Sequence, residues 1–228
     1  MGVFKIVGIN APNFPPPDNT AHLFPKPKFN PPKAANGNDG GALWWDHDDP
    51  GAAGNEGLLG SLGEPGFPGA SGGDAPAGVT VTISKTLNGA FNMVIAGGMG
   101  QAGGKAGNGG QGGEGQDGGD GDDEQPAGDG GKGGKGGQGG QGGNGGRGGN
   151  TNDVDLVVDG DISVTSVNVS YGQGIGGSPG QGGDGGSGGI GGKRGDNGPA
   201  APGGDQGDFG GLGQRGPDGH VGKLNIIV

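Results

Sequence analysis

Short runs in which apolar and polar residues alternate stand apart from the rest of the chain. "VTVTI" (79–83) and "AFNMVIA" (90–96) flank an Asn88-Gly89 pair, and residues 153–172 alternate around Asp159-Gly160. Alternation with a period of two predicts strands, and Asn-Gly or Asp-Gly between two such runs is typical of a tight hairpin turn. We therefore expect β-hairpins at 79–96 and 153–172.

Two further apolar runs lie near the ends of the chain. "VFKIVGI" (3–9) opens it, and the segment "KLNIIV" (223–228) closes it with a C-terminal strand. Together with the hairpins, these runs predict a small antiparallel β layer.

Between the apolar runs, glycine returns at every third position. Ala75 is the only exception from Gly51 to Gly78, and residues 130–150 read as seven successive Gly-Gly-X triplets. Three residues per turn is the repeat of the left-handed polyproline II helix, whose backbone forms no internal hydrogen bonds. The sequence thus predicts a bundle of parallel-packed polyglycine II helices that continues from the β layer, with mostly irregular or β structure and essentially no α-helix.

The breaks in the period bear on whether one chain or three build this structure. The periodic segments 97–120 and 130–150 are nearly equal in length around the break Gly121–Asp129, which favours a chain that folds back on itself. At the second break, Lys193–Gly203, the glycine phase runs through with Ala201 as the one exception, as it would in collagen. We expect a single-chain bundle, with a collagen-like trimer as the alternative.

Composition changes this picture in two ways. Seventy glycines and 17 prolines in 228 residues, with 27% hydrophobic residues, exclude an ordinary packed core. The formal net charge of −11 argues against binding to nucleic acid, which requires a basic surface.

The chain shows no signal-peptide pattern and no apolar run long enough for membrane insertion. We divide it into a Pro-rich attachment or capping segment (1–50) and the glycine-rich bundle (51–228).

Candidate chemistry is sparse. The three histidines have no partners at a catalytic spacing, so we expect neither an enzyme nor a cofactor. In "WWDHDD", Asp46, His47 and Asp48 are weak metal-ligand candidates, because side chains that are adjacent in sequence rarely converge on one ion; a solvated acidic loop is the preferred interpretation. Trp44 and Trp45 either cap the bundle or dock into a partner.

Arms of nearly equal length place the two breaks at the same end of the bundle, where loops on a rigid scaffold are suited to recognition. This end contains an Arg-Gly-Asp string, which arises readily by chance in such a chain. The candidate receptor-binding residues are Asp122, Asp123, Glu124, Gln125, Asp129, Lys193, Arg194, Asp196 and Asn197.

Glycine runs bracketed by strands, with "VGKLNIIV" after the last run, resemble the glycine-rich domains of phage tail-fibre proteins. The pattern is similar to the distal adhesins of T-even-like long tail fibres. This resemblance implies a polyglycine II sandwich on a virion, whose tip binds a bacterial surface protein or glycan and whose base joins a trimeric tail-fibre protein.

Springtail antifreeze proteins also use such bundles, and that resemblance implies a flat face of small residues. Here, long charged side chains such as Lys132, Lys135 and Arg147 roughen the face. The expected function is a non-enzymatic adhesin. A structural spacer or collagen-like trimeric attachment protein is the alternative, and ice binding the less favoured third.

Overall fold

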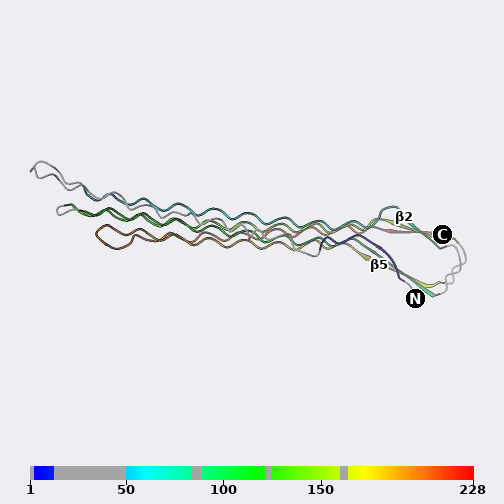
Figure 1. The fold of residues 1–228 in the computed structure, drawn as a ribbon. Coiled ribbons are helices and arrows are strands. Elements are labelled where there is room, and N and C mark those ends of the chain that lie inside the picture. The colour runs from blue at the N-terminus through cyan, green and yellow to red at the C-terminus, as the bar shows by residue number, and fades with distance from the viewer. Residues whose placement is uncertain (1–2, 13–49, 84–88, 122–124, 160–163) are drawn as a thin grey trace, which may run out of the picture.

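The computed structural model describes residues 3–12, 50–83, 89–121, 125–159 and 164–228, and these contain no α-helix. Five glycine-rich arms lie side by side and make up most of the length of the molecule, with the strands at one end (Figure 1). We number the arms along the chain: arm 1 (51–75), arm 2 (97–121), arm 3 (128–151), arm 4 (174–195) and arm 5 (201–222).

Backbone hydrogen bonds join neighbouring arms at every third residue. Arm 1 and arm 3 run in the same direction. Their ladder begins where the Gly54 amide donates to Asp129 O and ends where the Ala75 amide donates to Asn150 O, and both of these bonds are 2.8 Å long. Arms 1, 3 and 5 point toward the strands, whereas arms 2 and 4 run the opposite way. Arm 3 is bonded to all four others, so it is the centre of the described bundle.

The close approach of the arms explains the double glycines. The Gly139 amide donates to Asp208 O at 2.9 Å, and a Cβ on Gly139 would collide with the carbonyl oxygen of Gly183. A Cβ on the next residue, Gly140, would collide with the carbonyl oxygen of Glu64. Two of every three residues in arm 3 therefore face a neighbouring backbone, and only the third has room for a side chain.

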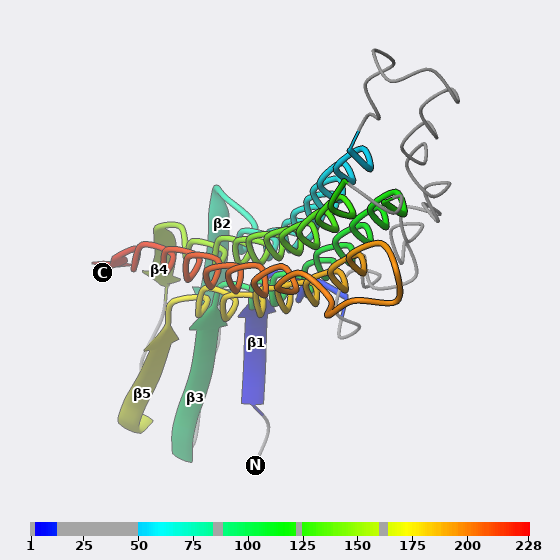
Figure 2. The ribbon, with the colours of Figure 1, turned by 90° about the vertical axis from the view of Figure 1, so that its left-hand side faces the viewer.

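The strands form two parallel sheets. One has the order β1 (Val3–Val7), β3 (Gly89–Ala96), β5 (Val164–Gly172); the other has β2 (Val79–Ile83), β4 (Val154–Val158), β6 (Leu224–Ile227). Figure 2 shows β1, β3 and β5 side by side at the end of the arms.

The expected antiparallel layer and the hairpins at 79–96 and 153–172 were therefore wrong. β2 and β3 belong to different sheets, and so do β4 and β5. The reason lies in the arms: β2, β4 and β6 each follow an arm that runs toward the strands, so all three leave the bundle in one direction. β3 and β5 each lead into an arm that runs away from the strands. The direction of the arms fixes the direction of the strands.

A small apolar core lies among the strands. Met93 and Ile95 of β3 and Val154 and Leu156 of β4 are almost completely buried, and Ile6 of β1 is buried with them. Alternate residues of each strand supply this core, as the period of two predicted. The segment after β1 continues beside arm 2, where the Ala11 amide donates to Met99 O at 2.8 Å.

Carboxylates at the strand end of the bundle accept backbone amides of adjacent arms. Asp74 Oδ1 accepts the Asn150 amide at 2.7 Å and Arg147 at 3.0 Å, and Asp218 Oδ1 accepts the Gly176 amide at 2.8 Å. The amide hydrogen bond is the main cause that lowers the pKa of each carboxyl group; a basic side chain, Arg147 for Asp74 and Arg215 for Asp218, lowers it further.

The packing of the arms predicts very different losses of stability for substitutions at two adjacent residues. Gly139→Val places a side chain against the Gly183 carbonyl and should lower the free energy of unfolding by more than about 3 kcal/mol, above the usual cost of overpacking because the neighbour is backbone. Gln138→Val, on the exposed edge, should change it by less than about 0.5 kcal/mol. Chemical denaturation measures both, and equal effects would contradict the close packing of arm 3.

Acid should weaken the strand end of the bundle. Because the folded-state pKa values of Asp74 and Asp218 are lowered, their stabilisation is complete above the unfolded-state pKa of about 4 and is lost as the pH falls through the folded-state values. Thermal melts between pH 5 and pH 2.5 should show a falling midpoint. The double variant Asp74→Asn, Asp218→Asn should show a smaller fall of the midpoint than the unsubstituted protein. The control variant Asp205→Asn should show the same fall as the unsubstituted protein.

Candidate functional site

The two breaks meet at the end of the bundle that lies opposite the strands (Figure 1). The Gly195 amide donates to Gly128 O at 3.0 Å, and Arg194 Nε lies 3.7 Å from Asp129 Oδ1. The same Arg194 nitrogen donates to Ala127 O at 3.4 Å. Chain segments more than 60 residues apart in sequence thus form one surface, which we call the tip.

The second break is a tight hairpin rather than an open loop. Lys193 pairs with Ala200 in an antiparallel bridge, and the Gly198 amide donates to Gly195 O at 3.1 Å. Asp196 and Asn197 have φ values of 56° and 55°, and two central residues in the left-handed region are typical of a type I′ turn. Asp and Asn adopt this region more readily than other residues with side chains. The Gly-Asp-Asn-Gly sequence of residues 195–198 is the local signal for this turn.

Two carboxylates of arm 2 hold the hairpin. The Lys193 amide donates to Asp117 Oδ1 at 2.6 Å, and the Asp196 amide donates to Asp120 Oδ1 at 2.8 Å. These two aspartates are not among the receptor-binding residues predicted from the sequence. Their third-position spacing, in phase with the break, was the signal that could have found them.

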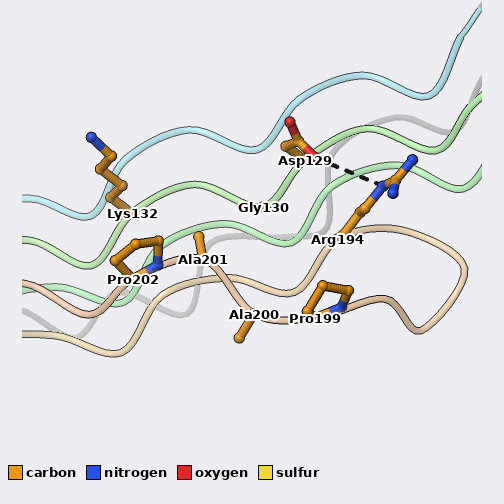
Figure 3. Close-up of a pocket in the computed structure, with 8 residues that line it drawn as sticks. All are labelled: Asp129, Gly130, Lys132, Arg194, Pro199, Ala200, Ala201 and Pro202. Atoms are coloured by element: carbon orange, nitrogen blue, oxygen red, sulfur yellow. Dashed lines mark ion pairs between the residues drawn. The ribbon is translucent and has the colours of Figure 1, made fainter.

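A pocket of about 280 Å³ lies where the hairpin, arm 3 and arm 5 meet (Figure 3). One wall consists of small apolar side chains from the end of the hairpin and the start of arm 5. The polar groups come from Asp129, Lys132 and Arg194. The apolar wall is formed by Pro199, Ala200, Ala201 and Pro202.

The charges of the pocket are only partly neutralised. Asp129 is 89% exposed and Arg194 43% exposed, and their separation of 3.7 Å makes a weak ion pair. Lys132 forms no ion pair with any residue that the structure describes, whereas Lys135, one triplet further along arm 3, lies 3.4 Å from Asp208. The pocket therefore carries an excess of positive charge on an acidic protein.

The structure places five of the predicted receptor-binding residues near one another. Asp129 and Arg194 line the pocket, and Asp196 and Asn197 form the exposed turn of the hairpin beside Lys193. Gln125, close to the start of arm 3, is half-buried. The other predicted residues lie outside the described part of the chain: Trp44, Trp45, Asp46, His47, Asp48, Asp122, Asp123 and Glu124.

Within the described ranges, no group of three or more histidine, aspartate or glutamate residues is placed to hold a metal ion. The same part of the chain contains no helix that is long and apolar enough to span a membrane.

Comparisons with known proteins place few constraints on this chain. It matches no protein-family model and no curated protein. Among solved structures, it is similar to a springtail antifreeze protein from Granisotoma rainieri, described as a nine polyproline type II helical bundle. The two sequences are 29% identical, and the match covers 68% of this chain and 93% of that one with a TM-score of 0.16. A superposition this poor carries no argument about fold or function.

The hairpin should loosen when its carboxylate anchor is removed. Asp117→Ala deletes the acceptor of the Lys193 amide, a bond worth about 1 kcal/mol, so exchange of that amide with solvent should become roughly five- to tenfold faster. The melting temperature should barely change, since the loss is local. Glu114→Ala, one triplet earlier on the same arm, is the matched control. Unchanged exchange at Lys193 would contradict the anchoring role.

Proposed function

We propose that the five arms are polyglycine II helices and that the protein is a non-enzymatic receptor-binding adhesin. The three-residue recurrence of the hydrogen bonds between arms supports the first part of this proposal. A helix with three residues per turn directs successive amides to three different sides. Arm 3 follows this pattern: its amides alternate between arm 2, arm 5 and the outside of the bundle.

One observation carries the functional proposal: both breaks in the glycine period come together at the end of a long scaffold, away from the strands. At about 3.1 Å per residue, an arm of roughly 24 residues extends the tip about 70 Å beyond the strands. Recognition residues concentrate on loops that a rigid scaffold positions. The tip fits this description, since backbone groups of the neighbouring arms and the carboxylates of Asp117 and Asp120 fix its hairpin.

We infer that the strand end faces the particle that bears the adhesin, namely the tip of a phage tail fibre, and that a trimeric fibre protein is its partner there. The tip then faces a bacterial surface protein or glycan. The difference between the two ends supports this orientation, because the strand end contains the apolar core and the tip contains exposed polar side chains.

A rigid spacer is the second candidate. The continuous ladder between arms supports a rigid scaffold, which is compatible with either function. The collagen-like version is less well supported, because the glycine amides that a triple helix would direct to partner chains are bonded within this chain. Ice binding is least favoured, since charged side chains interrupt the exposed face of arm 3.

Adsorption to bacterial cells distinguishes an adhesin from a spacer. A stripped-tip variant (Asp129→Ser, Arg194→Ser, Asn197→Gly) removes exposed groups and keeps a residue suited to positive φ in the turn. Fluorescently labelled protein should bind at least one strain in a panel of Gram-negative bacteria, and the variant should lose at least about tenfold in affinity, as expected when a few residues dominate binding.

The control variant carries three substitutions of similar size in the middle of the arms: Gln138→Ser, Gln141→Ser and Gln181→Ser. It should bind cells like the original protein. If the stripped-tip variant adsorbs fully while remaining folded, recognition does not reside in these tip residues and the proposal fails. If neither the original protein nor the control variant binds any strain although both are folded, the spacer function is preferred.

A further inference from the structure

The tip pocket combines two cationic side chains, one carboxylate and a small apolar wall (Figure 3). We propose that it binds a single acidic sugar residue of a bacterial surface glycan. The inference rests on the proposed function and names the ligand class of the same tip.

The two cationic side chains of the pocket suit a ligand that carries a carboxylate group. Both contacts of Arg194, to Asp129 and to Ala127, use Nε, and no described residue bonds to its terminal nitrogens. A guanidinium group binds a carboxylate through two parallel N–H donors when such an edge is available. Lys132 adds a second positive charge to the same pocket and has no ion-pair partner among the described residues. Together they outweigh the one negative charge of Asp129.

The presence of Asp129 restricts the ligand further. Its exposed carboxylate would repel a small anion without hydrogen-bond donors, such as a fully ionised phosphate. A ligand that carries hydroxyl groups beside its carboxylate avoids this conflict, because one hydroxyl donates to Asp129, the carboxylate meets Arg194, and a hydroxyl further along the ring accepts from Lys132. A sugar acid has both groups on one ring.

Size and shape agree with one ring. The volume of 280 Å³ corresponds to roughly nine water molecules, near the lower end for small-molecule pockets. The rings of Pro199 and Pro202 offer a surface for the C–H groups of a pyranose. An acidic side chain from a protein loop would carry the same charge but would supply no ring for this wall.

The pocket is also held in shape before a ligand arrives. The Arg194 amide donates to Pro199 O at 3.0 Å, the Ala201 amide to Gly192 O at 2.7 Å, and the Gly133 amide to Pro202 O at 3.0 Å. Backbone hydrogen bonds therefore tie its apolar wall to arms 3 and 4. A preformed site avoids the entropy cost of ordering a loop on binding.

Titrations followed by NMR of the nitrogen-15-labelled full chain test the proposal, with glucuronate, glucose and N-acetylglutamate amide as probes. Glucuronate should shift the Ala200 and Ala201 amide signals saturably, with a Kd of about 1 mM, and glucose should not at the same concentrations. Lys132→Gln and Arg194→Gln should each weaken glucuronate binding about tenfold, which is the effect of losing one charge-assisted hydrogen bond.

Matched controls lie on the same scaffold. Lys135→Gln, one triplet away and paired with Asp208, and Arg215→Gln, paired with Asp218, should leave glucuronate binding unchanged. The amide spectrum of each variant reports whether it is folded.

Three results would overturn the proposal. Equal shifts with glucose and glucuronate would show that charge does not select the ligand. Tighter binding of N-acetylglutamate amide would assign the pocket to an acidic protein loop. No shift with any probe would show that the pocket takes no small acid. In each case cell adsorption that still depends on the tip would leave the adhesin function intact, so the two failures are distinguishable.

Discussion

The hydrogen bond between backbones of neighbouring arms, repeated at every third residue, is the interaction on which the structure depends. It satisfies glycine amides that have no acceptor within their own arm, and it substitutes for the large apolar core that this composition cannot build. Such bonds form only where the backbones approach closely. A side chain at Gly139 would meet the Gly183 carbonyl. The hydrogen-bonding pattern therefore requires the glycine pattern.

The same constraint propagates to both ends of the molecule. At the strand end, the alternating directions of the arms sort the strands into two parallel sheets, and Met93, Ile95, Val154 and Leu156 fill the space among them. At the tip, the ladder ends with amides that no further arm can accept. There the side chains of Asp117 and Asp120 take over this role and fix the hairpin. The carboxylates Asp74 and Asp218 do the same near the strands.

This arrangement separates stability from recognition. Most polar side chains of the arms lie on an exposed edge, and most of the hydrogen bonds between arms join backbone to backbone. Exposed side chains at the tip can therefore change without loss of the scaffold, which agrees with the proposed adhesin function. The proposed ligand site beside Arg194 is built from such side chains: two cations, one carboxylate and a proline wall.

The sequence by itself determined the arms, their ends and the positions of the strands, because each follows from a local period: three for the glycine runs and two for the strands. It also placed Asp129 and Arg194 at one end, since arms of equal length must turn at the same level. Only the tertiary structure decided how the strands pair. The Asn88-Gly89 and Asp159-Gly160 pairs indicated hairpins, but the requirement that every strand continue its arm separated the strands on either side into different sheets. The pocket was equally beyond the sequence, because Lys132 and Pro202 lie 70 residues apart and meet only through the register of arms 3 and 5.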